Sequence, residues 1–318
     1  MAPAIPAGTP NLPVASGRAF EARFLRSFPA RMLAISTCWN SHRHTDGGSL
    51  LCEMAELGFS EVEVSHGTSV ALFPGMLAAL KRKAGPPARV CGVHNFCPSP
   101  VEILMDAPDA YEFTSRNEAD RERAIKLTLR SIDTAVQLGG RYVVLHLGSA
   151  RVRARTEALE KMALSGNLHS RRYIREKLAL IEAREAASEA ALKLVREALG
   201  IIVPYANDQG ILLGFESRSH YEQVPNEAEM RLLLEEYSDS PSVGYWHDFG
   251  HVQRRANLGL VDHAAWLGSV ADRLIGCHLH DVIWPQQDHQ VPFQGSIDYD
   301  PLVKHLSPEI PLVWEMSP

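Results

Sequence analysis

The chain has 318 residues, a formal net charge of −6, 45% hydrophobic residues and 22% charged residues. This composition is typical of a globular protein, and it excludes collagen-like and disordered chains. No apolar run reaches the roughly 18 residues that a transmembrane helix needs, and the N-terminus lacks a secretion-signal pattern. We therefore expect a cytoplasmic protein with no membrane partner.

Two further features of the composition concern partners. The five cysteines are scattered without a short paired spacing, which argues against a disulfide framework or a zinc knuckle. The chain is mildly acidic and has no long block of Lys and Arg. This argues against nucleic acid as a partner, because phosphate contacts dominate the affinity of nucleic-acid-binding proteins. A homo-oligomer is compatible with the sequence.

Residues 1–30 are predicted to form an N-terminal extension to a single domain of residues 31–318. The first sixteen are rich in Ala, Pro and Gly and carry no readable chemistry. Apolar residues then recur at helical spacing within 18–29, at Phe20, Phe24, Leu25 and Phe28. We expect this part of the extension to be helical and to pack on the domain beside its first and last strands.

Short β-branched or apolar runs alternate with longer helical patterns through the rest of the chain. The eight predicted strands are 31–38, 61–66, 88–95, 141–148, 211–217, 243–248, 274–281 and 311–316. The seven predicted helices between them are 48–58, 70–84, 117–138, 170–200, 226–237, 261–273 and 299–306. Strict alternation indicates a parallel sheet with crossover helices. Eight units without a glycine-rich phosphate loop favour a closed (β/α)8 TIM barrel over a doubly wound open sheet.

Imidazoles and carboxylates crowd the ends of the later strands. These residues are His94, His146, Glu216, Asp248 with His251 beyond it, His278 and His280, and Glu315. The carboxyl ends of barrel strands converge on one face, so side chains far apart in sequence can meet there. Two glutamates, an aspartate and a histidine aimed at one point form a mostly oxygen-donor site that suits Mn²⁺, Mg²⁺ or Co²⁺. Additional histidines shift the preference towards Zn²⁺.

The stretch HDFGH (247–251) has two interpretations. In the first, Asp248 is a metal ligand and Gly250 lets the chain turn so that His251 faces the same cavity. In the second, Asp248 caps the N-terminus of a helix, because Asp is a favoured capping residue. The sequence alone leaves both open.

The order of these motifs resembles the xylose isomerase-like TIM-barrel superfamily, which includes sugar isomerases, ketose 3-epimerases, inosose dehydratases and endonuclease IV. The resemblance covers roughly residues 31–318. It is carried by GSLLCEMAELGFSEVEVSH (48–66), VHNF (93–96), LGGRYVVLHLG (138–148), GFESRSHYE (214–222), HDFGH (247–251), HLHD (278–281), GSID (295–298) and VWEMSP (313–318). No single motif is diagnostic, but their order and placement make the resemblance fairly specific.

The resemblance implies a metal-dependent isomerase or epimerase acting on a sugar, a sugar phosphate or a keto-polyol. The implied ligands of one divalent metal are Glu216, Asp248, His278 and Glu315. Glu216 and Glu315 are also the implied acid and base, which move a proton through a metal-stabilised enediolate. Glu222 would contact the substrate, and His251 would orient a hydroxyl. No arginine comes shortly after His278, which departs from the epimerase pattern.

Two alternatives belong to the same superfamily. A keto-sugar dehydratase or lyase uses the same proton abstraction. An endonuclease IV-like enzyme, acting at abasic sites in DNA, would use additional metal positions: His94 and His146 would bind a second metal, and His251 and His289 would help to hold a third. The aspartate expected two residues before His289 is Gln287 here, although Asp288 is adjacent.

Further residues near the predicted mouth have two interpretations each. Trp39 and Trp246, with Trp284, would form apolar walls against a sugar ring or pack in the core. An arginine run would clamp an anion or form a solvated face: Arg151, Arg153, Arg155, Arg171 and Arg172. Segments 149–169 and 283–294 are predicted to be lids.

Overall fold

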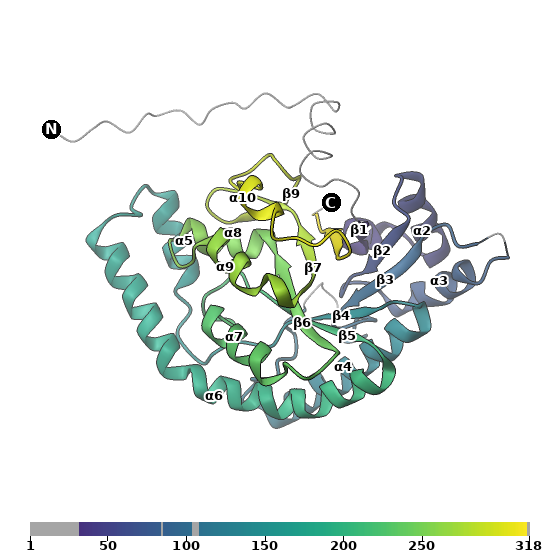
Figure 1. The fold of residues 1–318 in the computed structure, drawn as a ribbon, viewed down its shortest axis with the longest axis horizontal. Coiled ribbons are helices and arrows are strands. Elements are labelled where there is room, and N and C mark those ends of the chain that lie inside the picture. Colours follow the sequence, from purple (N-terminus) through teal and green to yellow (C-terminus); the bar gives the residue numbers. More distant parts are fainter. Residues whose placement is uncertain (1–31, 84, 104–107, 317–318) are drawn as a thin grey trace.

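The computed structural model describes residues 32–83, 85–103 and 108–316, and these form a closed barrel of parallel strands (Figure 1). Its strands are β1 (Met32–Ser36), β2 (Glu61–Val64), β3 (Arg89–His94), β4 (Tyr142–Leu145), β5 (Leu212–Glu216), β6 (Val243–Asp248), β7 (Leu274–Leu279) and β10 (Pro311–Trp314). Their order around the barrel is β1-β10-β7-β6-β5-β4-β3-β2. The predicted TIM barrel is confirmed. The predicted extension, residues 1–30, lies outside the described residues.

Helices surround the strands (Figure 1). The helices that match predicted ones are α2 (Gly47–Glu56), α3 (Phe73–Leu80), α4 (Glu118–Leu138), α6 (Arg171–Gln209), α7 (Glu227–Glu236), α9 (His263–Val270) and α10 (Asp300–Val303). Within the described residues, no helix combines the length and apolarity that crossing a bilayer requires.

Several elements differ from the predictions. Helix α6 continues to Gln209, beyond the predicted end at residue 200, because Ile202, Val203 and Ala206 are buried and extend its packing face. Two additional helices are α5 (Thr156–Leu164) and α8 (Phe249–Asn257), and a hairpin of β8 (Asp281–Ile283) and β9 (Gln287–Gln290) follows β7. The segments predicted as lids therefore contain regular structure.

The interior of the barrel is filled by two large aromatic side chains. Trp246 and Tyr142 are buried, with ring centroids 4.5 Å apart. Glycines on neighbouring strands give them room: a Cβ on Gly276 would lie 2.1 Å from Trp246, and one on Gly92 would lie 2.3 Å from Tyr142. The ring of His278 lies 5.1 Å from that of Trp246. This packing is a floor for the groups at the carboxyl ends of the strands.

Replacing Gly276 with alanine should lower the free energy of unfolding by about 1–3 kcal/mol, because the added methyl group overlaps a ring in a close-packed core. Urea denaturation measures the change. Gly200→Ala is the matched control: nothing lies within 4 Å of its missing Cβ, and it sits within α6. The control should be neutral or stabilising by about 0.5–1 kcal/mol. A Gly276→Ala variant as stable as the control would contradict the packing described.

Candidate active site

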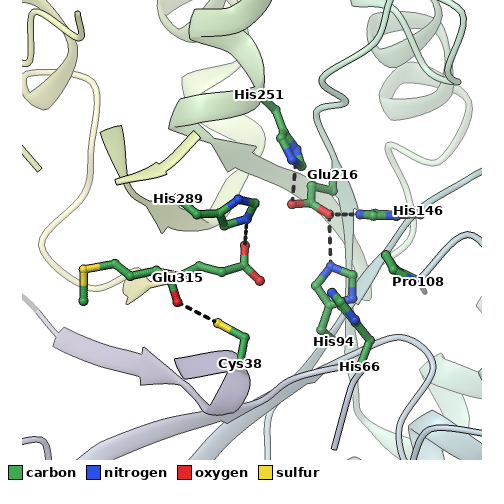
Figure 2. Close-up of a pocket in the computed structure, with 10 residues that line it drawn as sticks. Cys38, His66, His94, Pro108, His146, Glu216, His251, His289 and Glu315 are labelled. Atoms are coloured by element: carbon green, nitrogen blue, oxygen red, sulfur yellow. Dashed lines mark hydrogen bonds and ion pairs between the residues drawn. The ribbon is translucent and has the colours of Figure 1, made fainter. Parts of the chain in front are cut away.

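A cavity of about 290 Å³ lies at the carboxyl ends of the strands (Figure 2). Its lining consists mostly of imidazoles and carboxylates: Cys38, His66, His94, Pro108, His146, Glu216, His251, His289, Glu315 and Met316. A cavity of this size is at the small end of the range for small-molecule sites.

Four predicted ligands come together at the base of this cavity. Glu216, Asp248, His278 and Glu315 each offer one ligand atom, and these atoms all lie within 4.8 Å of one another. His278 Nδ1 is at the centre, 2.9 Å from Glu216 Oε1, 3.1 Å from Glu315 Oε2 and 3.7 Å from Asp248 Oδ2. The four residues come from β5, β6, β7 and the end of β10, which are consecutive around the barrel.

The second nitrogen of His278 is held by a residue that the sequence analysis did not single out. Its Nε2 lies 3.0 Å from Glu63 Oε1, and the Tyr142 hydroxyl donates to Glu63 Oε2 at 2.9 Å. Glu63 is fully buried on β2. The available signal was a glutamate in the middle of a strand whose neighbours, Val62 and Val64, are apolar. Such an anchor fixes the tautomer and orientation of an imidazole.

Charge balance in this group is set by burial and by opposite charges. Burial works against ionisation of Glu216, but His146 and His278 outweigh it and hold the pKa of Glu216 well below its usual range. Burial likewise opposes ionisation of Asp248 and Glu315, and neighbouring histidines lower both pKa values. Burial also disfavours the charged form of His278, yet the carboxylates around it raise its pKa well above the usual value. The site therefore favours three carboxylates and a positive charge among them.

Asp248 caps a helix and also lies among the four converging groups. It is the N-cap of α8: its Oδ1 accepts a hydrogen bond from His251 N at 2.6 Å, and its Oδ2 remains near His278. The expected turn at Gly250 is wrong, since Gly250 lies in the first turn of α8. A Cβ there would be 2.0 Å from His280, so the glycine makes room for that ring. His280 Nε2 contacts both oxygens of Asp248, at 3.0 and 3.1 Å.

His251 faces the cavity from α8. Its Nδ1 lies 3.0 Å from Ser217 O, so this nitrogen is the donor, and Glu216 Oε1 is 3.8 Å away. Burial lowers the pKa of His251 to about 4, despite the nearby carboxylates. The ring is therefore neutral at physiological pH, and its Nε2 is a hydrogen-bond acceptor.

His94 and His146 gather on the other oxygen of Glu216. Their Nε2 atoms lie 3.2 and 2.7 Å from Glu216 Oε2. His146 Nδ1 is held by Asp109 Oδ1 at 2.8 Å, and Arg218 pairs with the other oxygen of Asp109 at 2.6 Å. The sequence analysis missed Asp109, because it lies in a loop that no strand pattern points to.

His289 enters from the hairpin. Its Nε2 lies 3.8 Å from Glu315 Oε2, and its ring stacks on that of His280 with centroids 4.4 Å apart. Asp288, the residue before His289, pairs with Arg254 of α8 at 2.7 Å, and Arg254 also pairs with Glu160 of α5 at 2.8 Å. Arg254 therefore forms ion pairs with both predicted lid segments, 149–169 and 283–294.

Three residues predicted as substrate contacts have other surroundings. The carboxylate of Glu222 accepts hydrogen bonds from Arg155 N, and from Thr156 N and Oγ1 at 2.8 and 2.5 Å, at the start of α5. Trp246 lies in the barrel interior, and Trp39 lies under the Arg43 guanidinium at 4.1 Å from the ring centroid. None of the three lines the cavity. Their roles towards a substrate stay predictions.

The arginine run does not line the cavity either. Arg151 donates to Thr114 O and Ser115 O at 3.2 and 3.1 Å, and Arg155 pairs with Glu176. Arg153, Arg171 and Arg172 are exposed. These arginines hold loops or form a solvated face.

A family model described as xylose isomerase-like TIM barrel matches residues 52–316 of this chain. No curated protein matches the sequence significantly. Among solved structures, a D-tagatose 3-epimerase-like protein has a TM-score of 0.60 at 20% identity, covering 90% of this chain and 91% of that chain.

Two further solved structures share the fold. A putative xylose isomerase from Rhodospirillum rubrum has a TM-score of 0.66 at 16% identity, covering 90% of each chain. The IolI protein, described with a bound zinc atom, has a TM-score of 0.58 at 14% identity and covers 90% of this chain and 89% of that chain.

Replacing Glu222 with alanine should lower the free energy of unfolding by about 1–3 kcal/mol, because the donors at the start of α5 lose their acceptor. Glu157→Ala is the control, since Glu157 is exposed and pairs only with Lys161 at 3.6 Å. It should change stability by no more than about 0.5 kcal/mol. If Glu222→Ala keeps its stability and raises only KM, Glu222 is a substrate contact and not an anchor.

Proposed function

This chain belongs to the xylose isomerase-like TIM-barrel family, and on that premise we propose that it is a divalent-metal-dependent sugar isomerase or epimerase. One observation carries the proposal: Glu216, Asp248, His278 and Glu315 present ligand atoms to a common point beside a small cavity. The D-tagatose 3-epimerase-like neighbour adds support at the level of the fold.

The donor set fits a divalent cation. Glu216 and Asp248 are fully buried and Glu315 is 5% exposed, so their charges need a positive partner. Three carboxylates and one imidazole suit Mn²⁺, Mg²⁺ or Co²⁺, and Zn²⁺ is the alternative because so many histidines are near. A bound cation would supply stabilisation of negative charge on neighbouring substrate oxygens.

The acid and base are assigned to Glu216 and Glu315. Their strands, β5 and β10, are separated by β6 and β7, and the two carboxylates enter the cavity from different sides (Figure 2). One glutamate oxygen removes a proton from the carbon beside the substrate carbonyl, and the other returns a proton at a new position or on the other face.

The other cavity residues suit a polyhydroxylated substrate. His251 offers a neutral Nε2 as an acceptor for a sugar hydroxyl, since its Nδ1 is committed to Ser217 O. His146 and His94 bring further imidazoles to the same wall (Figure 2). We therefore propose a small sugar or keto-polyol as the partner of this site.

Exchange of a sugar proton with solvent deuterium tests the assignment. With a panel of ketoses and Mn²⁺, Co²⁺ or Zn²⁺ in D₂O, NMR should detect exchange that is lost on chelation. Glu216→Gln and Glu315→Gln should each slow it at least about 100-fold, because general acid–base catalysis contributes about 10²–10⁴. The exposed control Glu157→Gln should keep the full rate. Measuring the metal content of each variant separates loss of the base from loss of the cation, and a Gln variant with full exchange refutes the role.

Metal affinity tests the anchor behind His278. His278 and Tyr142 each donate a hydrogen bond to one carboxylate oxygen of Glu63. Glu63→Gln leaves a single amide oxygen as acceptor, so one of the two donors loses its partner. The affinity for Mn²⁺ or Zn²⁺ should therefore drop about 10–100-fold. Glu61→Gln is the control on the same strand, because Glu61 pairs only with the exposed Arg89 at 3.4 Å. Chelator competition measures both, and equal affinities would contradict the anchoring role.

Two other activities use the same site. A dehydratase or lyase shares the proton abstraction, and it is recognised by loss of water from the product. An endonuclease IV-like activity is favoured by one observation, the placement of His94 and His146 on Glu216 Oε2, which offers a second metal position. Among the histidines predicted as ligands for this alternative, His289 lies apart from His94 and His146, because it comes from the β8–β9 hairpin. Elemental analysis showing two or more ions per chain, with nicking of abasic duplex DNA, would favour this alternative.

A further inference from the structure

Helix α6 carries an exposed stripe on its N-terminal half. Ile174 is 48% exposed and Leu178 is 51% exposed. We call the whole set the α6 stripe: Arg171, Ile174, Arg175, Leu178, Glu182 and Glu185, all of them exposed. Contiguous apolar surface rimmed by polar residues marks an interaction site, and Ile174 and Leu178, one helical turn apart, form a small apolar strip bordered by charged residues.

The length of α6 sets this half apart from the barrel. The helix has 39 residues, so it is about 58 Å long at the usual rise of 1.5 Å per residue. Its later part buries Val195, Leu199 and Ile202 in the main core. The earlier part packs on α5 instead, through Tyr173 and Leu180. Figure 1 shows this part of α6 and α5 at the edge of the molecule, away from the strands.

The residues of the α6 stripe share one face of the helix. At 3.6 residues per turn, spacings of three, four and seven return to the same side, and the stripe follows these spacings. The opposite face is buried, at Tyr173, Leu180 and Arg184. The exposed apolar residues therefore do not belong to the fold's own packing.

Charge along the stripe changes sign at its middle. Arg171 and Arg175 precede Leu178, and Glu182 and Glu185 follow it. Within the part of the chain that the structure describes, none of these four has a salt-bridge partner, whereas the neighbouring Arg155 and Glu176 pair with each other. This charge pattern is self-complementary: when a second α6 helix lies antiparallel to the first, the basic half of each stripe lies opposite the acidic half of the other.

We propose that the α6 stripe is an interface for a second copy of this chain, with two α6 helices antiparallel about a two-fold axis near Leu178. Arg171 and Glu185 lie at equal sequence distances from Leu178, so each Arg171 faces Glu185 of the second copy. Arg175 then lies next to Glu182, and the Leu178 side chains meet at the axis. An isologous contact of this kind is the commonest route to a dimer.

The contact is small, because it involves one helix face from each copy, so a weak dimer is expected. Its charge pairs are exposed, and salt screens such pairs. Sedimentation velocity on the full chain, from about 1 to 100 µM, should therefore show a monomer–dimer equilibrium that shifts towards monomer at high salt. A chain that stays monomeric at 100 µM in low salt overturns the proposal.

Charge exchange tests the pairing itself. Arg171→Glu and Glu185→Arg each place like charges opposite one another, so each variant alone should weaken dimerisation at least about tenfold. The double variant restores opposite charges and should return to within about threefold of the original affinity. An equimolar mixture of the two single variants should form a heterodimer, because each copy supplies what the other lacks.

Substitutions of exposed apolar residues test whether dimerisation uses this interface or another surface. Leu178→Glu should abolish the dimer. Ile201→Glu is the matched control, since Ile201 lies on the same helix, is 53% exposed and points to a different side, and it should leave the dimer unchanged. Helix content by circular dichroism verifies that the variants fold. A dimer that survives Leu178→Glu, or charge variants without rescue, assigns the contact to another surface and overturns the proposal.

Discussion

The structure depends on one electrostatic constraint: three carboxylates are buried around a single imidazole nitrogen, His278 Nδ1. Removing an ionised carboxylate from water costs several kcal/mol unless it gains partners. The barrel meets this cost by taking one polar group from each of four consecutive strands and setting them above an apolar floor of Trp246 and Tyr142. Fixed charges in such a low-dielectric setting act strongly on whatever binds there.

The imidazoles around the cavity follow a common arrangement. In five of them, one nitrogen is tied to a fixed group and the other is turned towards a carboxylate or the cavity. The anchors are Glu63 for His278, Asp109 for His146, Asn95 O for His94, Ser217 O for His251 and His289 N for His280. Anchoring selects the tautomer and limits ring rotation, so the geometry exists before any ligand arrives. Ligand affinity then does not have to offset the ordering of these side chains.

Helix α8 connects this site to the segments over its mouth. Its N-cap is Asp248, one of the converging carboxylates, and its Arg254 pairs with both Glu160 of α5 and Asp288 of the hairpin. Glu222 adds a second tie at the start of α5. The same helix that positions a carboxylate therefore holds the surrounding loops. Helix α6 extends this outer layer beyond the barrel, where its exposed stripe is available for contact between copies.

The sequence by itself determined the fold and placed Glu216, Asp248, His278 and Glu315 at strand ends on one face; the family resemblance singled out these four from the other groups there. Alternating strand and helix patterns are local, and barrel closure brings strand ends to one face whatever the loops do. Only the tertiary structure decided which groups face each other across the barrel. For Glu63, the sequence showed only a glutamate in the middle of a predicted strand. The alternation of side chains along a strand does not identify the distant histidine that an inward-facing glutamate contacts. Asp109, Glu222 and Gly250 take their surroundings from loops and helices packed by long-range contacts, and these depend on side-chain volumes and burial that no local pattern records.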